Sequence, residues 1–195
     1  MLEEILSREN MTSALRRVQA NKGTSGVDGM SVDELQPYLK PRWSFIKAEL
    51  LDGTYKPSAV KQVEIPKPNG SKRKLGIPTV LDRLIQQAIS QKMTELYDVE
   101  FSATSYGFRP NRSAHQAVIQ AQKYLNEGNT YVIEFDLEKF FDNVNHDRLM
   151  AKLAERIEDK RLLRLIRSFL QAGVMENGLV NPVDEGTPQG GPLTP

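Results

Sequence analysis

Two Asn-Gly pairs constrain the fold of this 195-residue chain more than any other feature of its sequence. Asn69-Gly70 separates the alternating segments "AVKQVEIP" and "KRKLGIP", and Asn177-Gly178 lies in the stretch "GVMENGLVNPV". Asn-Gly suits the tightest hairpin turn, because both central residues of that turn need a positive φ. The sequence therefore predicts two β-hairpins, with the first two strands paired to each other.

Helical patterns account for most of the remaining chain. Apolar residues recur at helical spacing in the first twenty residues, and "NKG" predicts that this helix ends at Gly23. Ser31 and Glu34 form a capping-box pattern that opens a second helical region. We expect that region to break near Pro41 and to end at Gly53. Helices interleaved with antiparallel hairpins indicate an α+β fold.

The chain after Pro78 predicts four more helices and one strand. Thr79 can cap a long amphipathic helix, and Ser113 opens another through a capping-box pattern. An alternating strand follows at about 130–137. Two further helices are expected near 145–156 and 159–172.

Composition excludes several classes of protein. Hydrophobic residues make up 39% of the chain and charged residues 26%, and the formal net charge of +1 predicts no partner for the chain as a whole. The absence of cysteine excludes a disulfide scaffold, a thiolate zinc site and a cysteine nucleophile. The sequence contains no stretch of about 18 apolar residues, so it predicts no membrane span. We expect a cytoplasmic protein of bacterial type with no membrane partner.

One carboxylate stands out at the end of the predicted strand, in "YVIEFDLEKFFDNVNHDRL". One face of this strand is aromatic and aliphatic and should be core: Tyr131, Ile133, Phe135 and Leu137. Asp136 lies on the other face and can point into a cleft, where carboxylates and substrate phosphates hold ions such as Mg²⁺. One carboxylate is too few for such a site. The alternative is that Asp136 or Asp142 caps the turn before the next helix.

Basic residues are concentrated on the first hairpin. From Lys61 to Lys74 there are five basic residues and one acidic residue. A charged hairpin can be a solvated edge that guards against aggregation. It can also be a phosphate clamp, since lysine supplies a mobile charge and arginine a planar fork.

Two loops have the composition of ligand contacts. The glycines of "EGTPQGGPLTP" let backbone approach a ligand closely, and Gln189 can present a donor and an acceptor to it. The alternative is an ordinary turn. In "SYGFRPNRSAH", Arg109 and Arg112 precede a helix N-terminus, where nucleic-acid phosphates are favoured. The alternative there is a packed loop with Phe108 in the core.

In order along the chain, five motifs resemble those of the reverse transcriptases encoded by group II introns, also called maturases. They are the N-terminal extension "NKGTSGVDGMSVDEL", the fingers motifs "IPKPNGSKRKLGIP" and "SYGFRPNRSAHQAV", and the palm motifs "VIEFDLEKFFDNVNHDRL" and "GTPQGGPLTP". The resemblance covers essentially the whole chain. It implies an N-terminal extension helix and loop over 1–30, fingers over 31–130, and a partial palm over 131–195 with the thumb absent.

The resemblance also implies residue roles. Asp136 matches the first catalytic aspartate, and the backbone carbonyl of Leu137 matches a second metal ligand. Phe141 matches the aromatic steric gate that disfavours a 2′-hydroxyl on the incoming sugar. Nucleotide contacts are implied for Lys67, Arg73 and Gln189, and RNA or template contacts for Lys22, Lys72, Lys74, Arg109 and Arg112.

The implied reaction is attack of a primer 3′-hydroxyl on the α-phosphate of a deoxynucleotide, with two Mg²⁺ ions, or Mn²⁺ in their place. The implied partners are group II intron RNA, an RNA template with a DNA primer, and the deoxynucleoside triphosphate. The family's adjacent aspartate pair is expected beyond Pro195, so we expect the 195-residue chain to be inactive alone. Exposed palm surface should favour self-association. Asp142 and Asp147 are expected to cap and to form salt bridges.

Two other hypotheses stay open. In the first, the chain is a non-catalytic module that binds intron RNA by its shape and single-stranded loops. In the second, it comes from a retron or diversity-generating reverse transcriptase, which keeps the chemistry and changes the biology. An adjacent aspartate pair downstream in the gene would favour an enzyme over the binding module.

Overall fold

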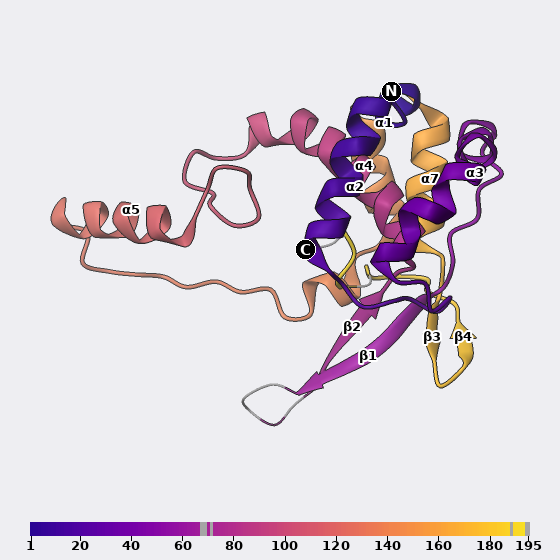
Figure 1. Ribbon diagram of the computed structural model, residues 1–195. Helices are drawn as coiled ribbons and strands as arrows, with labels where there is room; N and C mark the ends of the chain where they lie inside the picture. Colours follow the sequence, from indigo (N-terminus) through magenta and orange to yellow (C-terminus); the bar gives the residue numbers. More distant parts are fainter. Residues whose placement is uncertain (67–69, 71, 188, 194–195) are drawn as a thin grey trace. The chain divides into compact units, whose positions relative to one another are not determined.

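The computed structural model describes residues 1–66, 70, 72–187 and 189–193 (Figure 1). The chain divides into two compact units, Met1–Gln91 with Lys139–Pro195, and Lys92–Glu138. The first unit combines helices with a four-stranded sheet. The resemblance implies another division, into an N-terminal extension, fingers and a partial palm. These two units do not test it, so it stays a prediction.

Helices supply most of the core of the first unit. They are α1 (Leu2–Ile5), α2 (Arg8–Asn21), α3 (Val32–Asp52), the first part of α4 (Val80–Tyr97), the 3-10 turn η2 (Phe140–Asn143), α6 (His146–Ala154) and α7 (Lys160–Leu170). Their fully buried side chains include Leu2, Ile5, Leu35, Leu50, Leu84, Ile85, Ile89 and Leu162. Within the described ranges, no helix has the length and apolar composition needed to cross a membrane.

Helix α2 ends one residue earlier than the sequence predicts. Lys22, with φ of 45°, adopts the left-handed conformation, and its N–H donates to the Gln19 carbonyl. Gly23 does not have a positive φ; it packs next to the guanidinium of Arg83, which a side chain at this position would displace. The prediction that Gly23 supplies the left-handed residue was therefore wrong.

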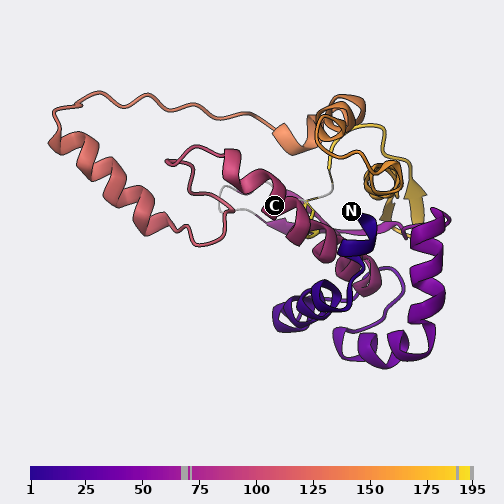
Figure 2. The same ribbon diagram turned by 90° about the horizontal axis from the view of Figure 1, so that it is seen from above.

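Helix α3 is continuous through two prolines. The predicted capping box is present, since Glu34 accepts from the Ser31 N–H at 2.8 Å, and the helix ends at Gly53 with φ of 73°. Pro37 and Pro41 both lie inside the helix, which Figure 2 shows to be sharply bent. Proline removes a backbone donor and crowds the preceding turn. The predicted break near Pro41 is thus a bend within one helix.

Both predicted hairpins are confirmed. Strand β1 (Val60–Pro66) pairs antiparallel with β2 (Lys72–Ile77), and β3 (Val174–Glu176) pairs antiparallel with β4 (Leu179–Asn181). Figure 1 shows β1 and β2 as a long ribbon that extends away from the helices of its unit. A parallel contact between β1 and β3 joins the hairpins into one sheet of order β2-β1-β3-β4.

The turn of the second hairpin has the expected backbone. Asn177 and Gly178 have φ of 52° and 83°, as the tight turn requires. In the first hairpin Gly70 has φ of 80°, while Asn69 lies outside the described residues.

A buried carboxylate ties α4 to the segment before β1. Asp82 is 1% exposed and accepts from the Tyr55 hydroxyl at 2.7 Å, the Thr79 hydroxyl at 2.8 Å and the Ser58 N–H at 3.0 Å. Burial raises the pKa of Asp82. Thr79 in turn accepts from the Asp82 N–H, which confirms it as the cap of α4.

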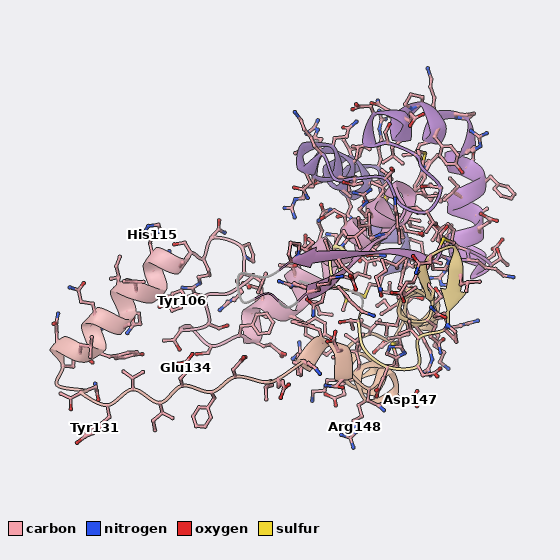
Figure 3. The ribbon with its side chains drawn as sticks, turned by 90° about the horizontal axis from the view of Figure 1, so that it is seen from below. Tyr106, His115, Tyr131, Glu134, Asp147 and Arg148 are labelled. Atoms are coloured by element: carbon pink, nitrogen blue, oxygen red, sulfur yellow. The ribbon has the colours of Figure 1, made fainter. Side chains whose placement is uncertain are left out.

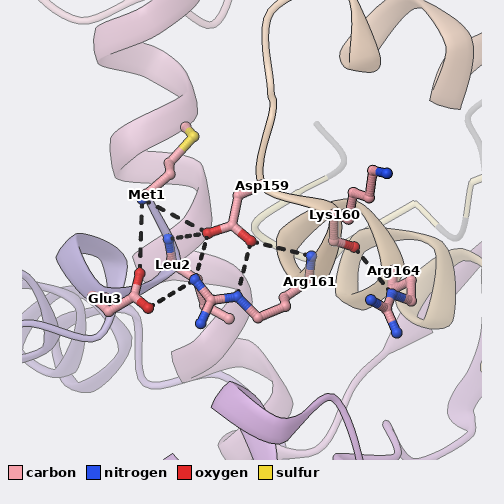
Figure 4. Close-up of polar contacts among 7 residues, drawn as sticks. All are labelled: Met1, Leu2, Glu3, Asp159, Lys160, Arg161 and Arg164. Carbon is pink, nitrogen blue, oxygen red and sulfur yellow. Dashed lines mark hydrogen bonds and ion pairs between the residues drawn. The ribbon is translucent and has the colours of Figure 1, made fainter.

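An acidic cap anchors α7 to the first residues of the chain (Figure 4). Asp159 accepts from the Arg161 N–H at 3.1 Å and the Leu2 N–H at 3.0 Å. The Arg161 guanidinium lies 3.0 Å from Asp159 and 2.7 Å from Glu3. Its hydrogen bonds are the main reason that the pKa of Asp159 lies well below the usual range.

The second unit contains α5 (Ala114–Asn126), the 3-10 turn η1 (Asp98–Glu100) and an extended segment. The capping box of Ser113 and Gln116 is present at the start of α5. Figure 3 shows Tyr131 and Glu134 along the extended segment that follows this helix.

The strand predicted at 130–137 is not formed. The face that was predicted to lie in the core is exposed instead, and the exposed fraction is 94% for Tyr131 and 91% for Phe135. A strand is stabilised by hydrogen bonds to a neighbour, and no described residue pairs with this segment. The alternating pattern indicates a preference for extended backbone. A strand also needs a pairing neighbour, and the described residues supply none for this segment.

Candidate active site

Two of the residues implied to contact a nucleotide meet in the first unit. Arg73 of β2 donates from Nε to Oε1 of Gln189 at 2.9 Å, across 116 positions of sequence. A backbone hydrogen bond links the same two segments, since the Gly76 N–H donates to the Gln189 carbonyl at 2.7 Å. The glutamine loop is therefore fastened to β2 by one side-chain bond and one backbone bond.

The other end of this loop is fastened to the segment after the predicted strand. The Thr187 N–H donates to the Phe141 carbonyl at 2.7 Å, and the Gly186 N–H donates to the Val144 carbonyl at 2.8 Å. Gly186 has φ of +83°, and a Cβ there would lie 2.7 Å from the Asp142 carbonyl oxygen. Only glycine fits this close backbone approach.

Hydrogen bonds thus link Phe141 to the loop that carries Gln189, and Gln189 to Arg73. It lies in η2, which begins after Lys139 in the left-handed conformation, with φ of 51°. Its ring is half-buried and meets the ring of Phe140 edge to face at 5.4 Å between centroids. The structure therefore brings three of the implied nucleotide residues together. Lys67, the fourth, lies outside the described residues.

A cavity of about 180 Å³ is lined by Gln189 and by Lys74 and Asp142, the residues that follow Arg73 and Phe141 in the sequence. Its lining includes Gln62, Lys74, Asp142, Glu185, Thr187 and Gln189. Ligand pockets usually measure about 300–1,000 Å³, so this cavity can hold part of a nucleotide and not the whole of one.

The basic residues of the hairpin differ in their surroundings. Lys72 lies 2.6 Å from Glu64, whose hydrogen bond raises the pKa of the lysine. Lys74 lies on the cavity wall. Lys22 is exposed at the end of α2.

The catalytic candidate Asp136 belongs to the second unit, together with Leu137. Its Oδ1 accepts from the Leu137 N–H at 2.9 Å, and the side chain is exposed. A carboxylate and a backbone carbonyl are donors that suit Mg²⁺, which takes oxygen ligands. These two cannot complete a site, and the described residues contain no group of three His, Asp or Glu side chains that could hold a metal ion.

Arg109 orders its own loop in the second unit. Its guanidinium contacts the Asp98 carboxylate at 2.7 Å and the carbonyls of Ser102 and Ser105 at 2.8 and 3.0 Å. It also lies 5.3 Å from the centre of the Phe101 ring, and its side chain is 8% exposed. The hydrogen bond from Arg109 lowers the pKa of Asp98. Since its donors are engaged within the loop, any effect on a nucleic acid passes through the loop conformation.

The neighbouring residues of this loop face solvent. Phe108 is 92% exposed, so the alternative that placed it in the core was wrong. The Arg112 guanidinium lies 5.7 Å from the centre of the Tyr106 ring, and Arg112 is exposed. Arg112 is thus the arginine of this motif that is open to a phosphate.

Sequence patterns missed two residues that hold loops in place. Arg83 donates to the Thr24 carbonyl and so fastens the glycine-rich "GTSGVDG" loop. His146 is 3% exposed, and its Nε2 lies 2.7 Å from the Gly186 carbonyl oxygen. No local pattern marks either contact, because each partner is distant in sequence. Asp147 forms the expected salt bridge, with Arg167 at 2.7 Å, but the residue that caps α6 is Asn145 and not an aspartate.

Comparison with known proteins decides the family. The family model described as "Reverse transcriptase (RNA-dependent DNA polymerase)" matches residues 65–195. The chain belongs to the reverse transcriptase family. Enzymes of this family generally use divalent metal ions.

Relatives of this reverse transcriptase domain include intron-encoded proteins. This chain is 39% identical over 201 residues to "Protein YkfC" of Escherichia coli K12, and the match covers 100% of this chain and 53% of that protein. It is 37% identical over 183 residues to "Group II intron-encoded protein LtrA" of Lactococcus lactis, covering 93% of this chain and 30% of that protein. The chain therefore spans about half of the first relative and under a third of the second.

The fold has a counterpart among solved structures. A chain of the "Partial Cas6-RT-Cas1–Cas2 complex" aligns with a TM-score of 0.64 and 22% identity, over 99% of this chain and 32% of the other. The α+β architecture and the reverse transcriptase resemblance are thus both confirmed.

Proposed function

We propose that this chain is the fingers and partial palm of the RNA-directed DNA polymerase of a mobile group II intron, which also binds intron RNA and assists its splicing. The substrates are a deoxynucleoside triphosphate and an RNA template paired with a DNA primer. Two Mg²⁺ ions supply charge stabilisation at the reacting phosphate when bound. Asp136 and the Leu137 carbonyl are the ligands that this chain contributes.

The hydrogen bond between Arg73 and Gln189 carries the proposal. It uses Nε of the arginine, and no described residue is a hydrogen-bond partner of the two terminal nitrogens. Those nitrogens form a planar fork that fits phosphate oxygens. Phe141 is fixed to the same loop through Thr187, which supports a site where triphosphate and sugar are recognised together.

Primer extension on an RNA template tests this proposal in the protein expressed from its complete gene. Asp136→Asn should lower kcat by more than about a hundredfold, since a metal ligand supports several kcal/mol of barrier reduction. Arg73→Ala should raise the KM for the deoxynucleotide by about tenfold or more. Arg164→Ala, at an exposed position of α7, is the matched arginine control and should change neither value.

The outcomes separate the proposal from its alternative. Incorporation that survives Asp136→Asn would refute it. Tight binding of intron RNA by a wild-type protein that incorporates no nucleotide would favour the RNA-binding module.

Sugar selection has its own test. Phe141→Ala should raise the incorporation of ribonucleotides relative to deoxynucleotides by about tenfold or more, because selection by exclusion depends on the bulk of the ring. A ratio equal to the wild-type ratio would remove Phe141 from this role.

RNA contacts are proposed for the exposed cations Lys22, Lys72, Lys74 and Arg112, with Arg109 acting through the loop that it orders. Each removed phosphate contact should reduce the salt dependence of RNA binding by about one unit of slope. A slope unchanged in the quadruple alanine variant would contradict these assignments. The cytoplasm remains our proposed location, supported by the lack of cysteine.

Tested by itself, the 195-residue chain should incorporate no nucleotide. A single catalytic carboxylate cannot hold two metal ions in register. Template-directed incorporation by the purified chain would refute this expectation.

A further inference from the structure

A buried histidine contacts the loop that carries Gln189. His146 begins α6 and is 3% exposed. Its Nε2 lies 2.7 Å from the Gly186 carbonyl oxygen, 40 positions later in sequence. A carbonyl oxygen can only accept, so Nε2 must carry the proton and donate. The other ring nitrogen, Nδ1, is buried and has no hydrogen-bond partner among the described residues.

This bond fixes one peptide plane from both sides. The Gly186 carbonyl and the Thr187 N–H belong to the same peptide group, which is planar and rigid. His146 donates to the carbonyl end, and the Phe141 carbonyl accepts from the N–H end at 2.7 Å. With both ends held, this peptide group cannot rotate without breaking a buried hydrogen bond.

The fixed peptide lies two residues before Gln189. On the far side of that short stretch, Gln189 is held by Arg73 at 2.9 Å and by the Gly76 N–H at 2.7 Å. The orientation of the peptide after Gly186 therefore limits where the Gln189 side chain can lie. Of the contacts that hold this peptide, the one from His146 is made by a side chain and can be removed by substitution.

We propose that His146 is a positioning residue for nucleotide binding, acting through the Gly186–Thr187 peptide to hold Gln189 against Arg73. This inference rests on the proposed polymerase function. His146 touches neither substrate nor metal in this role. Its effect is to keep the glutamine in the conformation that meets the incoming nucleotide.

A purely structural role predicts different results. A histidine that only fills the core would lower stability when replaced, without a selective effect on the nucleotide. His146→Gln separates the two roles, because the glutamine Nε2 lies close to the position of the histidine Nε2 and can donate to the same carbonyl. His146→Leu removes the donor and keeps an apolar side chain.

The test combines primer extension with amide hydrogen exchange. In the protein expressed from its complete gene, His146→Leu should raise the KM for the deoxynucleotide by roughly tenfold and leave kcat within about twofold. Amide exchange in peptides covering 185–190 should accelerate by roughly tenfold. His146→Gln should restore both values to within about threefold of wild type. His115→Leu, at an exposed position of α5, is the matched control and should change neither.

Equal KM values in His146→Gln and His146→Leu would overturn the proposal. So would a stability loss in His146→Leu with exchange at 185–190 unchanged. If the wild-type protein incorporates no nucleotide, the proposed function fails, and the exchange measurement still decides whether His146 holds the loop.

Discussion

Replacing Gly186 by alanine should destabilise the protein far more than replacing Gly178. The two glycines share a φ of +83°, so an alanine at either position adopts the same unfavourable backbone conformation. That conformation costs an L-residue about 1–2 kcal/mol. Around Gly178, however, an added Cβ would meet no atom within 4 Å. The pair therefore separates backbone strain from close approach.

At Gly186 the added methyl group would lie 2.7 Å from the Asp142 carbonyl oxygen and 3.1 Å from that of Phe141. Both are backbone atoms, so the loop itself has to move. Movement breaks the bonds from Gly186 to Val144 and from Thr187 to Phe141, at about 1 kcal/mol each. We expect a loss of about 3–4 kcal/mol for Gly186→Ala and about 1–2 kcal/mol for Gly178→Ala.

Urea unfolding measures this difference through the fluorescence of Trp43. It is the single tryptophan of the chain and lies in α3, in the same compact unit as both glycines. The entropy that alanine removes from the unfolded chain is common to both variants and cancels in the comparison. Losses within about 0.5 kcal/mol of each other, at an unchanged m-value, would show that the close approach at Gly186 is not the cause.

Three further predictions concern the acidic cap of α7, the Arg109 loop and the exposed segment. Because the pKa of Asp159 is held below its usual value of 3.8, its contribution to stability is complete above about pH 4 and is lost on further acidification. Asp159→Asn should lower the free energy of unfolding by about 1–2 kcal/mol at pH 7; a difference from wild type that widens toward pH 2 would contradict this. Arg109→Lys keeps the charge but loses the planar fork, so amide exchange over 98–112 should accelerate by roughly tenfold. Arg112→Lys is its control, and equal exchange in the two variants would count against the Arg109 network. In sedimentation the 195-residue chain should show species larger than a monomer, which Phe135→Ser diminishes; a monomeric wild type at high protein concentration would refute self-association.

Features that depend on neighbouring residues were predictable from the sequence. The Asn177-Gly178 turn and the capping boxes at Ser31 and Ser113 each involve residues at most three positions apart. The strand at 130–137 failed for the opposite reason. Its alternation is a local property, but a strand forms only with a partner, and no described residue supplies one.

The candidate site was predictable to a different extent. Motif order placed Arg73, Phe141 and Gln189 in one function, and the structure links them by hydrogen bonds. Motif order did not reveal the engagement of Arg109, because a guanidinium binds a carboxylate with the same geometry as a phosphate. The role of His146 was not predictable either. Its partner is a backbone carbonyl 40 positions away, and a backbone atom leaves no signal in the sequence.

The double attachment of the glutamine loop also sets its length. The Thr187 N–H donates to the Phe141 carbonyl and the Gln189 carbonyl accepts from the Gly76 N–H, so the two anchors lie only two positions apart in the sequence. One inserted residue would add about 3.3 Å of chain between the anchors, which has to bulge outward or displace one of the two hydrogen bonds. Insertions and affinity tags belong instead at the open Asn177-Gly178 turn, where extra chain can loop into solvent.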